Sequence, residues 1–370
     1  MAAAHDVNGR VLDQPAVFAV RIVMRQLCER VDATWRTHLQ ADASERGPGG
    51  DAEEALHDFR VAVRTLRSWA RSHQDLLDLP RRTRRRLKRI AQATNPMRDA
   101  EVLDQTLAAL DGISERGRVA SRHVVGRAQV AATDEAERLH SKLLRDVQRA
   151  LPEVMRHIVG VRLSSNPVEP WRFPTLAQEL ADRLPRRAAA LGELLRQLTA
   201  EGEPAALHRT RLAAKRVRYL IEPVASEVPE AKPALKELKM LQDVLGGLND
   251  LSNAQIQLVG AAVERSADEG AARAREIIAA ATEGRAPARR ESVLSGFAAV
   301  ARVLSERRQE VFADFEGRFQ LDGARALFVG IERLVAALAG SGDAAASDDR
   351  PGVSNVAAPL DPLSPVEPAE

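Results

Sequence analysis

The feature that most constrains the fold is an internal repeat, in which two stretches of the chain match at one offset of 151 residues without a gap. Residues 55–67 align with residues 206–218, and both stretches are rich in Ala, Leu and Arg. The same offset pairs three downstream cations with three lysines: Arg81, Arg85 and Lys88 with Lys232, Lys236 and Lys239. One offset that holds over this length predicts two copies of a single structural unit.

Composition indicates that this unit is helical. Strong helix formers dominate the chain, and no convincing strand pattern occurs. Only 12 of 370 residues are aromatic, which argues against a β-sandwich or barrel and against an RNA module that stacks bases on rings. We therefore predict an all-α fold.

Proline-rich sequence near 164–174 marks the boundary between the copies. The predicted organisation is an N-terminal extension (1–15), a first copy (about 16–160), a second copy (about 172–338) and a C-terminal tail (339–370).

The net charge of +2 hides an uneven distribution of charge. Residues 340–370 contain one basic and six acidic side chains, a net charge of −5, so the rest of the chain carries +7. The tail has no sustained apolar period and is predicted to be disordered. A basic body with an acidic tail points to an anionic partner.

The low cysteine content and the lack of long apolar runs exclude several classes of protein. A single cysteine, Cys28, excludes a disulfide framework and a multi-cysteine metal site, and we predict no metal or other cofactor. No uncharged apolar run reaches the length of a membrane span, and the first residues lack a signal pattern. We expect a cytoplasmic protein that does not bind membranes.

Each copy presents one helix face that consists almost entirely of cations. On a helical wheel, one arc of about 80° collects five residues of the first copy, and its counterpart collects four of the second. These residues are His57, Arg60, Arg64, Arg67 and Arg71, and His208, Arg211, Lys215 and Arg218. Apolar residues such as Phe59, Leu66 and Trp69 occupy the opposite face in the first copy, as Ala214 and Val217 do in the second.

A solvated helix usually interleaves acids among its cations, because like charges four residues apart repel. No acid lies between Phe59 and Gln74, and the second copy departs from the cationic pattern only where Glu222 replaces Arg71. We infer that a polyanion supplies the missing counter-charge. His57 and His208 open the two stripes and are predicted to contact the anion as well.

With these residues in view, the chain resembles the CHAD family, the conserved histidine α-helical domain. The resemblance rests on the duplicated pattern of His57 and His208 with the cations that follow each, and covers about residues 16–338. The segments at Arg98–Leu103 and Leu241–Asp250 are also similar to the family.

The resemblance implies two four-helix bundles related by a pseudo-two-fold axis, with a basic central groove or pore that binds inorganic polyphosphate. It also implies association with polyphosphate granules, where some members of the family are found. Carried onto this chain, the predicted polyphosphate-binding residues are His57, Arg60, Arg64, Arg67, Arg71, Arg81, Arg85, Lys88, His208, Arg211, Lys215, Arg218, Lys232, Lys236 and Lys239. On spacing alone, Arg21 and Arg25 are candidates to join them.

Two other classes of function stay open at this stage. The basic body is compatible with nucleic-acid binding, although aromatics are scarce and no reading motif is present. A polyphosphate-metabolising enzyme would need a phosphate loop or metal-binding carboxylates, and neither pattern occurs, so we predict no catalysis. We expect Asp99 and Asp250 to cap helices or to orient an arginine. A third possibility is a structural adaptor at a granule surface. It would differ from the favoured function only in binding other components besides polyphosphate.

Overall fold

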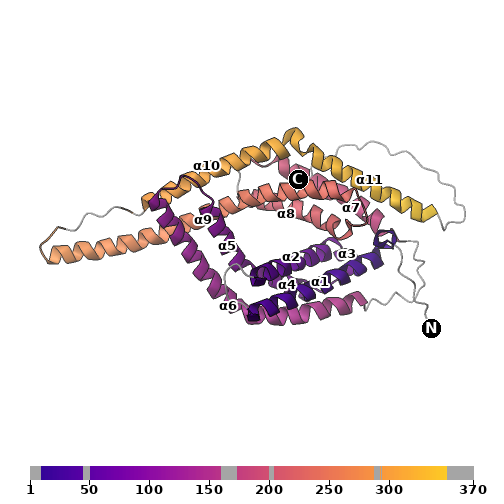
Figure 1. The fold of residues 1–370 in the computed structure, drawn as a ribbon, viewed down its shortest axis with the longest axis horizontal. Coiled ribbons are helices and arrows are strands. Elements are labelled where there is room, and N and C mark those ends of the chain that lie inside the picture. Colours follow the sequence, from indigo (N-terminus) through magenta and orange to yellow (C-terminus); the bar gives the residue numbers. More distant parts are fainter. Residues whose placement is uncertain are drawn as a thin grey trace, which may run out of the picture.

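A computed structural model describes residues 10–44, 51–159, 173–199, 204–286, 292 and 294–347. The α-helices are α1 (Ala16–Ser44), α2 (Asp51–Ser72), α3 (Gln74–Leu77), α4 (Arg81–Ala93), α5 (Asn95–Ala108), α6 (Glu115–Val159), α7 (Leu176–Arg196), α8 (Pro204–Ile221), α9 (Ala231–Thr282), α10 (Leu294–Phe319) and α11 (Arg325–Ser347). No strand occurs among these residues, so the predicted all-α fold is confirmed. The helices of the two copies form two halves, with α1, α2 and α4 on one side and α7, α8 and α11 on the other (Figure 1).

The two halves are joined where each of them begins. Ala16 donates a backbone hydrogen bond to Pro174 (2.8 Å), and Leu176 donates one to Gln14 (2.9 Å). These bonds hold the start of α1 beside the start of α7, the first helix of each predicted copy. The pseudo-two-fold relation between two four-helix bundles stays a prediction.

The apolar faces predicted for the repeated helices form the core. On α2, Phe59, Leu66 and Trp69 are fully buried, and on α8 so are Ala214 and Val217. One large cluster of buried side chains includes residues of α1, α2, α7 and α8, so both copies share a core. Because each helix buries one face in this core, the cationic stripe is directed away from it.

The copies differ in the stretch that follows α4 in the first copy and its equivalent, the beginning of α9, in the second. In the first copy α4 ends at Ala93 and α5 begins at Asn95, followed by Pro96, which cannot donate the backbone hydrogen bond of a continuous helix. The equivalent positions in the second copy are Gly246 and Gly247, and there the single helix α9 runs through without interruption. Asn95-Pro96 therefore separates two helices that the second copy fuses into one.

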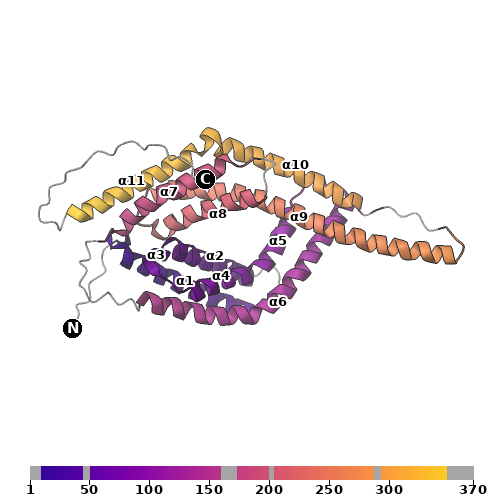
Figure 2. The same cartoon turned by 180° about the vertical axis from the view of Figure 1, so that it is seen from behind.

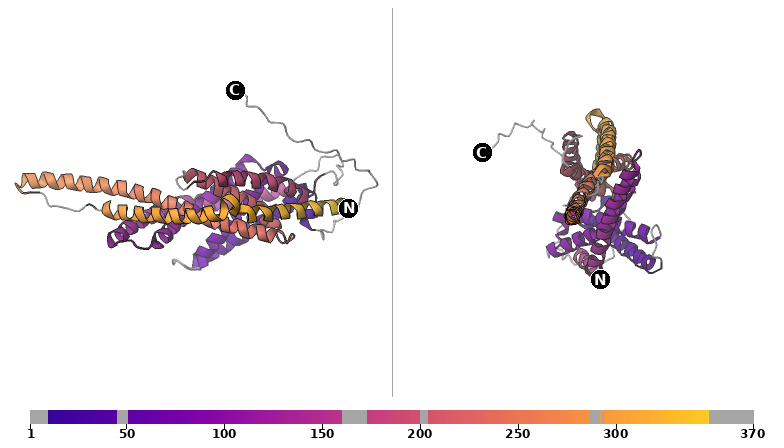
Figure 3. Two further views of the ribbon diagram at one scale, coloured as in Figure 1. Left: turned by 90° about the horizontal axis from the view of Figure 1, so that it is seen from above. Right: turned by 90° about the vertical axis from the view of Figure 1, so that its left-hand side faces the viewer.

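A second cluster of buried side chains lies where α5, α6, α9 and α10 meet. Beyond this cluster the outer part of α9 projects past the other helices, as the reverse view and the view from above also show (Figures 2 and 3). At the far end of the chain α11 continues to Ser347, beyond the helix end near Leu338 that the sequence suggests. The predicted extension up to residue 9, the copy boundary at 160–172 and the tail from 348 lie outside the described residues.

Candidate polyanion site

The two cationic stripes come together where α2 contacts α8. The charge of Arg64, on α2, lowers the pKa of Lys215, on α8, and Arg64 and Arg67 both interact electrostatically with Tyr219. We call the set at this contact the central cationic cluster: Arg60, Arg64 and Arg67 on α2, and Arg211, Lys215 and Arg218 on α8. Residues 151 positions apart in the sequence thus belong to one electrostatic unit.

Loss of hydration makes this cluster costly to keep charged. Arg60 is only 6% exposed, and burial together with the charge of Arg64 lowers its pKa to about 10. Burial and the charges of Arg211 and Arg64 lower the pKa of Lys215 to about 7. The pKa of Arg67 is lowered by burial and then by Arg64. The cations repel one another, which raises the free energy of their charged forms, and the positive charge at this place is not fully balanced by acids.

Two guanidinium groups in the cluster each contain one buried nitrogen without a hydrogen-bond partner. Among the described residues nothing accepts a hydrogen bond from the buried Nη2 of Arg60 or from the buried Nε of Arg211. These two arginines occupy equivalent positions in the two copies. Buried donors are normally satisfied, because leaving one unpaired costs about 1–3 kcal/mol. Both copies therefore bury an unsatisfied guanidinium nitrogen at this position, Nη2 in Arg60 and Nε in Arg211.

Two carboxylates accompany the six cations. Asp99 interacts with Arg60 and Arg64, and its equivalent, Asp250, interacts with Arg211. Desolvation raises the pKa of both acids, and the charge of Asp250 contributes to the rise at Asp99. Together with Glu222, which pairs with Arg218, these acids number three against six cations and leave an excess of positive charge.

The prediction that these two acids cap helices is wrong, because Asp99 lies inside α5 and Asp250 inside α9. The alternative part of that prediction, an interaction with arginine, agrees with the structure. No sequence pattern separates the two roles, since an Asp after a helix break serves equally well as a cap.

The two halves of the cluster are not identical. Arg218 forms an ion pair with Glu222 (3.3 Å) and donates a hydrogen bond to Gln242 (2.8 Å). Arg64 donates a hydrogen bond to Oδ1 of Asn95 (3.3 Å). Arg71, which Glu222 replaces in the second copy, is exposed. Arg218 is therefore partly neutralised, whereas Arg60, Arg211 and Lys215 have no ion pair among the described residues.

The remaining predicted residues form no hydrogen bond or ion pair with the cluster among the described residues. All of them are exposed: His57 and His208 near the starts of α2 and α8, Arg81, Arg85 and Lys88 on α4, and Lys232, Lys236 and Lys239 on α9. Two further candidates have other partners, since Arg21 donates to the carbonyl of Leu76 (3.4 Å) and Arg25 pairs with Glu29 (2.9 Å).

Helix α4 shows that the absence of partners is a property of one face. On its other side Arg86 lies 3.2 Å from Asp146 of α6 and also pairs with Glu153, and Arg89 donates two hydrogen bonds of 2.7 Å to Asp146. Within the part of the chain that the structure describes, no acid pairs with Arg81, Arg85 or Lys88 on the other face. The chain thus neutralises the cations that join α4 to α6.

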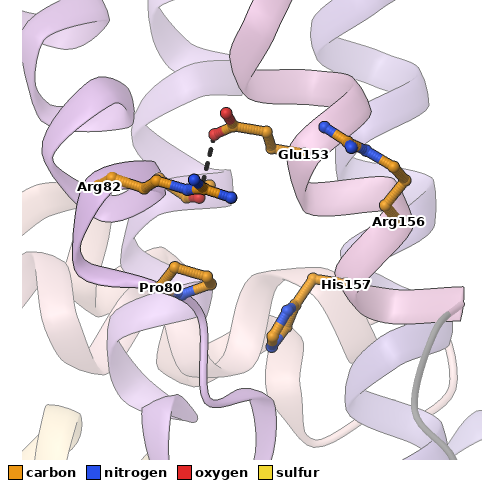
Figure 4. A pocket seen from close by; sticks show the side chains of 6 residues that line it. Pro80, Arg82, Glu153, Arg156 and His157 are labelled. Atoms are coloured by element: carbon orange, nitrogen blue, oxygen red, sulfur yellow. Dashed lines mark hydrogen bonds between the residues drawn. The ribbon is translucent and has the colours of Figure 1, made fainter.

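A small pocket of about 160 Å³ lies apart from the cluster, between the start of α4 and the end of α6. Arg82, Arg156 and His157 line it, and Glu153 accepts a hydrogen bond there from the hydroxyl of Thr83 (3.1 Å) (Figure 4). Glu153 belongs to the ion-pair network with Arg86, so this pocket is part of the α4–α6 contact.

Within the described residues no three His, Cys, Asp or Glu side chains gather in a position to ligate a metal ion. Of the helices described above, none combines the length and the apolar character of a membrane span.

Comparison with known proteins identifies the family to which this architecture belongs. A model of the CHAD domain family matches residues 31–259, which is more than half of the chain and includes both cationic helices. The chain belongs to the CHAD domain family. The match ends within α9, so α10 and α11 lie outside it.

Two solved structures share the CHAD fold of this chain. One is the CHAD domain from the plant Ricinus communis, with a TM-score of 0.54 and 18% identity over 90% of this chain and 96% of that one. The other is PptA from Streptomyces chartreusis, with a TM-score of 0.51 and 19% identity over 86% of this chain and 99% of that one. At this identity the likeness concerns the fold alone. No curated protein matches the chain.

Proposed function

We propose that this CHAD protein binds inorganic polyphosphate, without catalysis, through the central cationic cluster and the exposed cations around it. The observation that carries the proposal is the pair of buried, unsatisfied guanidinium donors at Arg60 and Arg211, set among cations that outnumber their acids. Phosphoryl oxygens satisfy such donors and supply the missing charge at the same time.

The shape of the site favours a polymer over a single phosphate. The stripe from His57 to Arg67 spans about 15 Å at about 1.5 Å per residue, far more than one phosphate needs. Cations reach the contact from both α2 and α8, so a chain that carries charge at every unit has partners on two sides. Arginine provides forked donors for phosphoryl oxygens, and Lys215 provides a point charge.

The exposed residues on α4 and α9, together with His57 and His208, would extend this binding surface. Their cations add long-range attraction, and the buried cluster adds hydrogen bonds that depend on position. We propose that the protein acts in the cytoplasm and that this binding directs it to polyphosphate granules.

The proposal is tested by titrating the protein with polyphosphates of graded length at two salt concentrations. In Arg60→Gln/Arg211→Gln, two charge-assisted hydrogen-bonding groups worth about 1.5–3 kcal/mol each are lost, so affinity should fall by about 100-fold or more. The matched control is Arg186→Gln/Arg307→Gln, which removes the same charge from arginines paired with exposed acids. Equal losses in both variants would show that only net charge matters and would contradict the assigned site.

Two further measurements separate this function from its alternatives. Competition between polyphosphate and duplex DNA at one ionic strength should favour polyphosphate; preference for DNA would identify a nucleic-acid-binding protein instead. Incubation with polyphosphate and Mg²⁺ should release no phosphate. Release that disappears in Arg60→Gln/Arg211→Gln would identify an enzyme.

A further inference from the structure

The outer part of α9 forms an arm that the polyphosphate site does not use. The last α9 residue in the second core cluster is Ala261, yet the helix continues to Thr282. At about 1.5 Å per residue this adds roughly 30 Å of helix. Figures 1 and 3 show the arm projecting past the ends of α6 and α10.

One side of the arm carries a stripe of apolar and small residues with alternating steps of four and three. We call these residues the arm stripe: Val263, Ala267, Gly270, Ala274, Ile277 and Ala281. All six are exposed, and Val263 and Ile277 are 63% and 45% exposed. Alternating steps of this kind are the signature of a helix that packs against another helix in a coiled coil.

More exposed apolar residues flank the arm stripe. Val259 and Ile256, nearer the body, are 63% and 56% exposed, and Ile278, near the tip, is 67% exposed. An isolated helix gains little stability in water without packing of its apolar face. A contiguous apolar surface of this length on a projecting helix is typical of an interaction site.

The charges of the arm indicate which partner fits. Residues 263–270 contain Glu264, Arg265, Asp268 and Glu269; Glu264 already pairs with Arg127 of α6, which leaves a net charge of −1. Residues 271–278 contain Arg275 and the pair Arg273–Glu276, a net charge of +1. A second arm in antiparallel orientation brings the acidic half of each helix beside the basic half of the other. A parallel arrangement brings like charges together, which is unfavourable.

Residue size supports the same pairing. The middle of the arm stripe holds only Ala267, Gly270 and Ala274, and nothing lies within 4 Å of a Cβ placed on Gly270. Small side chains let two helix backbones approach closely, so that many atoms come into van der Waals contact. In an antiparallel pair, Val263 of one arm lies near the Ala274–Ile277 segment of the other.

We propose that the arm is a dimerisation element, and that two copies of this chain pair their arm stripes as an antiparallel coiled coil. The arrangement leaves α2 and α8 of each copy uncovered, so the dimer holds two polyphosphate sites. The inference rests on the arm alone and does not depend on the ligand.

Mass measurement in solution tests the pairing directly. Light scattering or sedimentation equilibrium on the full chain should show a mass that rises with concentration towards twice the 40.3 kDa of one chain. Ala274→Glu, in the arm stripe, should keep the protein monomeric. Ala279→Glu makes the same change at an exposed alanine on the far side of the arm and should leave dimerisation intact. A wild type that stays monomeric, or equal effects of both variants, would overturn the proposal.

Cross-linking tests the orientation of the two arms. Val263→Cys and Ala274→Cys proteins are mixed and treated with a short thiol cross-linker. Cys28 does not interfere, because it is buried and burial raises its pKa to about 12. Antiparallel pairing predicts cross-links between the two different variants. Cross-links only within the Val263→Cys protein would indicate parallel arms and refute the arrangement.

Discussion

Replacing Lys215 by arginine should remove most of the pH dependence of polyphosphate binding between about pH 7 and about pH 9. In the free protein, burial and the charges of Arg211 and Arg64 lower the pKa of Lys215 to about 7. A bound polyanion reverses the electrostatic part of this effect, because phosphoryl oxygens stabilise the ammonium form. The amine should therefore take up a proton when polyphosphate binds.

The size of the effect follows from the lowered pKa of Lys215. With a pKa of about 7, the amine is half protonated at about pH 7 and about 1% protonated at about pH 9. If binding restores the ordinary pKa of lysine, the affinity for polyphosphate at about pH 9 is roughly 50-fold lower than the affinity at about pH 7. Arginine stays charged throughout this range, so Lys215→Arg should lose much less. The titration stops at about pH 9 because the pKa of Arg60 is also lowered, to about 10.

Fluorescence anisotropy with labelled polyphosphate at constant ionic strength measures the affinities. Calorimetry in two buffers with different ionisation enthalpies counts the protons taken up, close to one per bound chain at about pH 8 for the wild type and near zero for Lys215→Arg. Equal affinities of the wild type at the two pH values would refute the reasoning. So would a loss of affinity in Lys215→Arg as large as in the wild type.

Three predictions concern the stability of the free protein. The unfolded chain binds a proton at Lys215 that the folded state holds weakly, so thermal stability should rise from about pH 7 to about pH 9; Lys215→Met should flatten this rise, and an unchanged slope in a scanning calorimeter would contradict it. Asp146→Ala leaves the largely buried Arg86 without one of its two carboxylate partners and should cost about 3 kcal/mol in urea unfolding; a cost below about 1 kcal/mol would place that pair among ordinary surface pairs. Gly296→Ala puts a Cβ 2.5 Å from a backbone oxygen of α6 and should lower the free energy of unfolding by about 1–3 kcal/mol, whereas Gly126→Ala, which meets no atom within 4 Å, should not lower it.

Much of this fold could be predicted because its repeat is encoded locally. The apolar face of α2 followed from the helical period, and Phe59 and Trp69 are indeed fully buried. The convergence of the two stripes was implied by the resemblance to the CHAD family and not by the helical period. Which cations are desolvated could not be predicted from the sequence; the structure shows it through the unsatisfied donors at Arg60 and Arg211.

Other features depend on tertiary packing and could not be predicted. On α4, Arg86 and Arg85 are neighbours in an unbroken basic run, and only the position of α6 decides that Arg86 is paired and Arg85 is exposed. The hydrogen bond from Arg218 on α8 to Gln242 on α9 is likewise a contact between two helices, and residue spacing does not predict it. The break at Asn95-Pro96 was predictable from proline. The continuous helix at Gly246-Gly247 depends on the surrounding helices, because glycine itself disfavours a helix interior.

The central claim is that cations from both copies form one polyphosphate site, and the stoichiometry of binding in half-site variants tests it most directly. Calorimetric titration of the wild type with polyphosphate about as long as the stripes should give one site per chain. Arg60→Ala/Arg64→Ala on α2 and Arg211→Ala/Lys215→Ala on α8 should each weaken that single event, with losses that are not additive because the residues share one ligand. Two independent sites in the wild type, of which each variant removes one, would contradict the account.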